Sequence, residues 1–213
     1  IAGSESGDLV DQISFYEFLV GISSQDEATL VSIEAGANDM LNNFNLLAAN
    51  APGANAQADA VIGSILDNLK AAFLRMRQNA PGVRFIIWTI PDLTLTPRYF
   101  NQLSPTQIAN VRAHLERVNR KIRRGVNRPK VVVLDADAMI LSLIANPPVL
   151  RGQPLLPPPA FCDFHHLFAD DIHPTAVSNA ILANATSQSN NDKWSDTIPF
   201  YSEGELADLA LIP

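Results

Sequence analysis

One short segment pairs a carboxylate with a histidine at a spacing that suits acid–base chemistry. Asp170 precedes His173 by three residues, and Pro174 follows at a position where it can open a helix. On such a turn the carboxylate can orient the imidazole ring and stabilise its protonated form. A general base held in this way serves a nucleophile elsewhere in the fold. A solvated surface loop is the alternative interpretation of the same pattern.

A second segment places an amide at the end of a predicted strand. The apolar run Leu30 to Ile33 contains β-branched residues and is typical of a buried strand, and Gly36 then begins a turn that carries Asn38 and Asp39. In an open α/β sheet, ligands bind at the carboxyl ends of the strands. An Asn amide there can donate a hydrogen bond to a developing oxyanion. An Asn-Asp turn that caps the next helix is the competing interpretation.

Together the two segments resemble sequence blocks of the SGNH, or GDSL-type, serine esterase and lipase family. Residues 36–39, Gly-Ala-Asn-Asp, are similar to the family's G-x-N-D block, and residues 170–174 are similar to its D-x-x-H-P block. Between them, the stretch from Trp88 to Pro97, Asp135 after an apolar run, and the stretch from Asn146 to Asp163 follow the family's order. The resemblance covers roughly residues 1 to 186.

The resemblance implies a reaction and a role for each residue. It implies a carboxylic ester hydrolase that forms a covalent acyl ester on a serine, with His173 as the base and Asp170 as the residue that orients it. Asn38 and the backbone N–H of Gly3 would form the oxyanion hole. The resemblance implies no cofactor and no metal, and a substrate that is a small-molecule ester or an ester of a lipid or sugar. A non-catalytic pseudo-enzyme or binding module on the same fold is the alternative.

The family's G-D-S block, which carries the nucleophilic serine, does not occur in this sequence. The residues around Gly3 instead resemble the family's second block, so we expect the nucleophile upstream of Ile1. Ser4 and Ser6 do not replace it, because Glu5 stands between them and no strand precedes them to form a nucleophile elbow. A flexible terminus or a helix cap is their expected role.

The apolar spacing predicts strands and helices in alternation. The predicted strands are Leu30 to Ile33, Val83 to Ile90 and Val131 to Leu134; the predicted helices are Asp8 to Gly21, Ala56 to Asn79, Ser104 to Gly125 and one that ends near Ala145. This order indicates an α/β fold with a parallel sheet. The resemblance implies its three-layer flavodoxin-like form, with the first strands missing from this chain. The strand at Leu30 would then be an open edge, which we expect to pair with the chain's own N-terminal fragment or with a strand exchanged from a second copy.

Two later segments interrupt the alternation. The proline-rich stretch from Asn146 to His166 predicts an extended surface loop and a candidate wall of the substrate pocket. The polar stretch from Ser187 to Asp196 predicts a linker, and the apolar residues before Pro213 predict a short helix that packs back on the body. We therefore divide the chain into a hydrolase-like domain over residues 1–186 and a linker with a C-terminal tail over residues 187–213.

Composition excludes several functions. The 213 residues carry a net charge of −7, which argues against nucleic acid as a partner, and the basic residues from Arg112 to Arg124 are assigned to the polar face of a helix. No apolar run approaches the roughly 20 residues that cross a bilayer. The single Cys162 supports neither an internal disulfide nor a cysteine-based metal site, and a site built on His165 and His166 is disfavoured. We expect His114 to be half-exposed on its helix.

Overall fold

The computed structural model describes residue 9 and residues 12–14, 30–79, 82–125 and 129–213. Within these residues the main sheet has three parallel strands, β1 (Leu30–Ile33), β2 (Arg84–Trp88) and β3 (Val131–Leu134), in the order β1-β2-β3. The register pairs Ile33 with Ile87 and Ile87 with Val133. The predicted α/β fold with a parallel sheet is confirmed.

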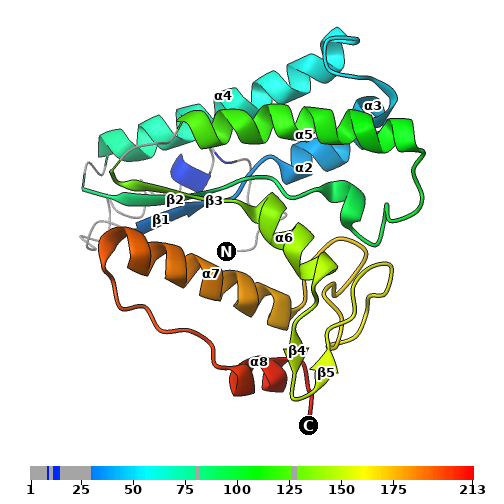
Figure 1. Ribbon diagram of the computed structural model, residues 1–213. Helices are drawn as coiled ribbons and strands as arrows, with labels where there is room; N and C mark the ends of the chain where they lie inside the picture. The colour runs from blue at the N-terminus through cyan, green and yellow to red at the C-terminus, as the bar shows by residue number, and fades with distance from the viewer. Residues whose placement is uncertain (1–8, 10–11, 15–29, 80–81, 126–128) are drawn as a thin grey trace.

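Helices cover both faces of this sheet (Figure 1). α4 (Ala56–Asn79) and α5 (Pro105–Gly125) lie on one face with the short helices α2 (Ala37–Asn42) and α3 (Phe44–Ala49), and α7 (Ala176–Trp194) lies on the other. The apolar stripes predicted for α4 and α5 form one buried core with the strands, and its members include Ile62, Ile65, Phe73, Phe85, Val111 and Val118. The burial of these stripes is what holds the helices on the sheet.

Polar side chains fix the helix ends. α5 begins with the predicted capping box, in which the Ser104 N–H donates to Gln107 Oε1 at 2.9 Å and the Gln107 N–H donates to Ser104 Oγ at 3.3 Å. Asp135 accepts the Ala138 N–H at the start of α6 (Ala136–Ala145), and Thr175 caps α7 in the same way. The family-like Asp135 thus has a structural role at the end of β3.

The end of β2 is held by one buried amide. Asn119 of α5 donates from Nδ2 to the Ile90 carbonyl at 2.8 Å, and its Oδ1 accepts the Ile90 N–H at 2.8 Å. The chain then passes through Pro91 into the 3-10 turn η1 (Leu93–Leu95). Asn119 therefore supplies the pairing that the backbone loses where the strand stops.

The prediction of a linker over Ser187 to Asp196 is wrong, because α7 continues to Trp194. The amide of Asn184 exchanges two hydrogen bonds with the backbone of Tyr201, at 2.9 and 2.7 Å. The amide of Asn191 does the same with Ile198, at 3.0 and 2.9 Å. The polar composition that suggested a linker instead fastens the returning chain along the helix.

The C-terminal helix and the irregular course of the proline-rich loop agree with expectation, but no residue of the stretch from Asn146 to His166 lines the cavity that contains His173. α8 (Glu203–Leu209) follows, and residues around Ala207 and Ile212 pack with Leu155, Phe168 and Val177 in a second core cluster. The proline-rich loop contains only the two-residue strands β4 (Val149–Leu150) and β5 (Gln153–Pro154). Among the residues that the structure describes, no helix combines the length and apolar character that a membrane span requires.

His114 does not follow the prediction. It is fully buried in α5, and its Nε2 lies 2.9 Å from the Asn50 carbonyl oxygen. Helical spacing next to Leu115 suggested a boundary position. The packing of α3 and α4 against α5 closes over it, which the sequence of one helix does not reveal.

Candidate active site

A tight turn before α7 holds His173 against Asp170. The Nδ1 atom of His173 lies 2.7 Å from Asp170 Oδ2. Because an ionised carboxylate can only accept, Nδ1 is the ring atom that carries the shared proton. The other carboxylate oxygen, Oδ1, accepts the backbone N–H groups of Ile172 at 2.7 Å and of His173 at 2.6 Å. One side chain thus fixes both the shape of the turn and the orientation of the ring.

Further bonds hold this turn in place from both sides. Phe168 and Pro174 form a β-bridge, and the Ala169 N–H donates to the His173 carbonyl at 2.8 Å. The guanidinium group of Arg98 donates two hydrogen bonds, of 2.8 and 3.0 Å, to the carboxylate of the neighbouring Asp171. The segment is therefore anchored independently of the Asp170–His173 bond.

The environment of Asp170 keeps its carboxylate ionised. Desolvation raises its pKa, but the hydrogen bonds from the His173 N–H, the His173 ring and the Ile172 N–H outweigh this and lower the pKa to about 2. The side chains of His173 and Asp170 are 76% and 51% exposed. Asp170 is thus ionised at neutral pH, and the His173 ring is exposed enough for another molecule to reach it.

Asn38 is positioned by a turn that only glycine can form. Gly36 has φ 99°, and a Cβ built on it would lie 2.7 Å from both Ile65 Cγ2 and Ile90 Cδ1. Without a side chain, the turn packs directly on α4 and on the end of β2. Asn38 follows at the start of α2 with its side chain exposed, and within the described chain its amide has no protein partner.

One cavity of about 790 Å³ has both Asn38 and His173 in its wall. The floor is the sheet face that carries Leu30, Ser32, Ile86 and Trp88, and α7 faces it with Leu182, Thr186 and Asn190. Leu93, Thr96 and Ile172 complete the wall near His173. The structure therefore brings together an exposed amide and an oriented imidazole from segments far apart in the sequence.

The cavity also contains polar residues that the sequence analysis did not single out. Trp88 Nε1 donates to Ser32 Oγ at 2.8 Å. Glu34 follows β1 on the same face as Ser32, and although it keeps contact with solvent, desolvation raises its pKa. The signal was present in the alternation of Ser32 and Glu34 with buried Ile33, which marks a strand with one polar face.

The other expected members of the site are not placed. Gly3, the second expected oxyanion donor, lies outside the described residues, as do Ser4 and Ser6. In the part of the chain that is described, no hydroxyl is hydrogen-bonded to His173 Nε2. The nucleophile is therefore not identified among those residues.

The residues considered for other chemistry have separate roles. No group of three His, Cys, Asp or Glu among the described residues is arranged to hold a metal ion, and His165 Nδ1 lies 3.8 Å from Asp163 Oδ1. Several arginines of α5 form ion pairs with carboxylates: Arg112 with Asp92, Arg117 with Asp59, and Arg123 with Asp135 and Glu116.

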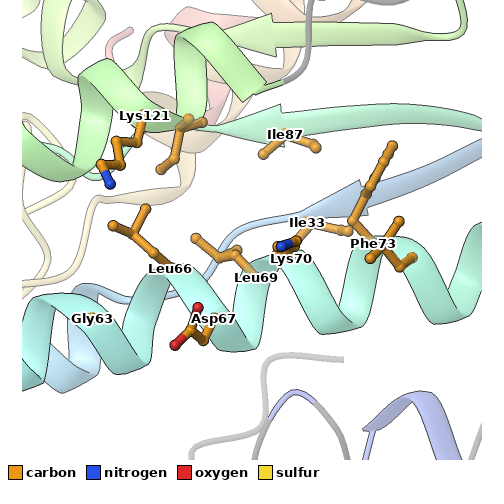
Figure 2. Close-up of a pocket in the computed structure, with 11 residues that line it drawn as sticks. Ile33, Gly63, Leu66, Asp67, Leu69, Lys70, Phe73, Ile87 and Lys121 are labelled. Atoms are coloured by element: carbon orange, nitrogen blue, oxygen red, sulfur yellow. The ribbon is translucent and has the colours of Figure 1, made fainter.

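A second cavity, of about 480 Å³, lies on the opposite face of the sheet (Figure 2). Leu66, Leu69 and Phe73 of α4 and Ile33 of β1 make it mainly apolar, and Lys121 reaches it from α5. It contains neither Asn38 nor His173. The chemistry of the oriented imidazole therefore belongs to the larger cavity.

Comparison with known protein families agrees with the two sequence blocks. The model of the GDSL-like Lipase/Acylhydrolase family matches residues 2–181, a stretch that includes both the Gly36 turn and the Asp170–His173 turn. A comparison with curated proteins found no match. Since the family model covers most of the chain, the protein belongs to the GDSL-like lipase and acylhydrolase family, as the sequence resemblance predicted.

Proposed function

We propose that this protein is a carboxylic ester hydrolase that works through an acyl-enzyme intermediate. Its family supports hydrolase chemistry in general. The observation that carries the proposal is the Asp170–His173 pair, whose ring shares one cavity with the exposed amide of Asn38.

His173 is the proposed general base. With the proton on Nδ1 held by Asp170, Nε2 has a free lone pair that can accept the proton of a serine hydroxyl. The serine oxygen then attacks the ester carbonyl, and the protonated ring returns its proton to the leaving alcohol. Water repeats the sequence and releases the acid. Asp170 stays ionised throughout and stabilises the imidazolium.

Asn38 is the proposed oxyanion donor. The backbone N–H of Gly3 and that of the nucleophile would complete the hole, and the nucleophilic serine itself would come from a segment outside the described residues. Removing one such donor raises a reaction barrier by roughly 3–4 kcal/mol in serine hydrolases.

The proposed substrate is a small-molecule ester or an ester of a lipid or sugar. The apolar floor and roof of the larger cavity, which include Leu30, Ile86 and Leu182, suit the hydrocarbon part of such an ester.

The edge of β1 has no strand partner among the described residues. We propose that an N-terminal fragment of this protein or an exchanged strand pairs there.

A non-catalytic binding module is the second candidate. It is favoured by one observation: within the described part of the chain, His173 has no hydroxyl to activate. Such a module would keep the cavity and the Asn38 turn but bind esters without turnover.

An activity assay with a matched histidine control separates the two functions. Protein from its natural source, with its N-terminus and intact mass determined, is assayed on p-nitrophenyl acetate and butyrate and treated with a fluorophosphonate that labels activated serines. We expect labelling and turnover, both lost in a His173→Ala form. His165→Ala removes another histidine near a carboxylate, Asp163, and should keep both. Absence of both labelling and turnover in the unmodified protein would favour the binding module.

A further inference from the structure

Three large apolar side chains stand exposed on the loop that leads to His173. Leu156, Phe161 and Phe164 are 44%, 41% and 53% exposed. In Figure 1 this loop, in yellow beside β4 and β5, lies at the end of the molecule where α2 and α6 follow their strands. Exposed apolar residues scattered singly are ordinary, but three large ones within nine residues of a single loop indicate an interaction surface.

The loop is internally bonded and does not need a partner to fold. The Leu156 N–H donates to the His165 carbonyl at 2.8 Å, and the Leu167 N–H donates to the Leu156 carbonyl at 2.9 Å. Asp163 Oδ1 accepts the Phe164 N–H at 2.6 Å, and the Asp163 carbonyl accepts the His166 N–H at 3.1 Å. Because these backbone groups are already paired, the apolar side chains can enter a nonpolar phase without carrying unpaired N–H groups with them.

The same loop is continuous with the candidate active site. Phe168 lines the larger cavity and bridges to Pro174, and the Cys162 N–H donates to the Phe168 carbonyl at 3.3 Å. The loop that carries the three apolar side chains is therefore bonded, through Cys162 and Phe168, to the turn that carries His173.

We propose that Leu156, Phe161 and Phe164 form an insertion patch that docks the protein on the surface of uncharged or zwitterionic lipid aggregates. Phenylalanine and leucine side chains on a surface partition into the boundary between head groups and acyl chains. Three side chains are too few for a stable protein interface, which buries about 800 Å² on each partner. This inference rests on the proposed esterase function and specifies its substrate: a lipid ester within an aggregate.

Charge selects the kind of aggregate. The chain has a net charge of −7, and the loop and the turn after it carry Asp163, Asp170 and Asp171. An anionic lipid surface repels such a protein. The insertion patch therefore fits phosphatidylcholine or an uncharged ester droplet and not a surface of anionic lipids.

The only cysteine of the chain allows a direct test. Cys162 is exposed on this loop, so an environment-sensitive fluorophore attached there reports insertion. With phosphatidylcholine vesicles we expect a blue shift of the label, and co-sedimentation of the unlabelled protein. The double variant Phe161→Ser, Phe164→Ser should bind these vesicles at least about tenfold more weakly. Phe200→Ser is the matched control, because Phe200 is also about half exposed, at 46%, but lies in the segment between α7 and α8 and not on the loop of the insertion patch. This variant should bind the vesicles like the unmodified protein.

Three outcomes would overturn the inference: no binding of the unlabelled protein to phosphatidylcholine vesicles, binding only to vesicles of anionic phosphatidylglycerol, or an equal loss in the Phe200 variant. Circular dichroism of each variant establishes that it is folded. Vesicle binding is measured without turnover, so its failure leaves the esterase proposal intact, and failure of turnover leaves the binding result intact.

Discussion

Replacing Asp170 with asparagine separates the two tasks of this carboxylate. Asparagine keeps an oxygen that can accept the backbone N–H groups of Ile172 and His173, so the turn is retained. Its NH₂ group replaces the oxygen that accepts the Nδ1 proton at 2.7 Å. Since two donors cannot share a hydrogen bond, the ring proton moves to Nε2, the atom that a general base must keep free.

The expected loss of turnover is large and the loss of stability small. Exchanging the carboxylate of a serine triad for an amide lowers turnover by roughly 10³–10⁴-fold, which corresponds to about 4–5.5 kcal/mol of barrier. The free energy of unfolding should fall by about 1 kcal/mol or less, because both side chains are more than half exposed and water replaces the lost contact.

Asp171→Asn is the matched control. It removes a neighbouring carboxylate and its ion pair with Arg98 but leaves the imidazole untouched. Ester turnover, thermal melting and the ¹⁵N chemical shifts of the ring nitrogens of His173 are measured for both variants. Turnover within about tenfold of the unmodified protein in Asp170→Asn, or an equal loss in Asp171→Asn, would refute the role of Asp170.

The pKa of Asp170 adds a pH signature to the same variant. A carboxylate whose pKa is lower in the folded state stabilises the fold above its unfolded pKa, and the contribution is lost as the pH falls through the folded value. With a folded pKa of about 2, any stability difference between the unmodified protein and Asp170→Asn should be constant above about pH 5 and shrink between about pH 4 and 2.

Three further substitutions test other parts of the site. Asn38→Ala should lower kcat/KM by roughly 10²–10³-fold with unchanged melting, because its exposed amide has no partner among the described residues; normal kinetics would remove it from the oxyanion hole. Glu34→Gln should raise the melting temperature at pH 8, because a carboxylate whose pKa is raised in the folded state destabilises the fold when it is ionised. The increase in melting temperature should vanish below about pH 4, where Glu34 is protonated in both states, and an increase that persists in acid would contradict the reasoning. Asn119→Ala should cost about 2–4 kcal/mol in urea unfolding, because it leaves the Ile90 N–H and carbonyl without partners; a change below about 0.5 kcal/mol would show that water replaces the amide.

The regular part of the fold was predictable because each element carries its own signal. The strand at Leu30 and that at Val131 are short β-branched runs, and α4 has the predicted bounds because its apolar stripe ends at Met76 and a Pro-Gly pair follows Ala80 in the sequence. The Asp170–His173 turn was predictable for the same reason, since both partners and the bonds between them lie within four consecutive residues.

The failures concern contacts between distant segments. Asn191 was assigned to a linker because its amide favours irregular structure when considered locally, and Asn184 was not singled out. Their partners, Tyr201 and Ile198, lie beyond the end of the helix, so nothing in the local sequence shows that these amides are used. Burial of His114 likewise depends on α3 and α4. Glu34 in the wall of the larger cavity was missed because the burial that raises its pKa comes from the folded cavity and not from its sequence neighbours.

The place of Asn119 within α5 protects the amide that holds the end of β2 from chemical ageing. An asparagine that deamidates becomes an aspartate, which differs by a single group and hardly changes the mass. At Asn119 the new carboxylate oxygen would face the Ile90 carbonyl oxygen in a place that water does not reach. The loop from Pro91 through Leu93, which walls the larger cavity, would lose this attachment to α5 and keep the ion pair of Asp92 with Arg112. Deamidation needs a backbone free to turn and a water molecule, and the helix and the burial of Asn119 withhold both, so a stored preparation should keep this end of β2 intact.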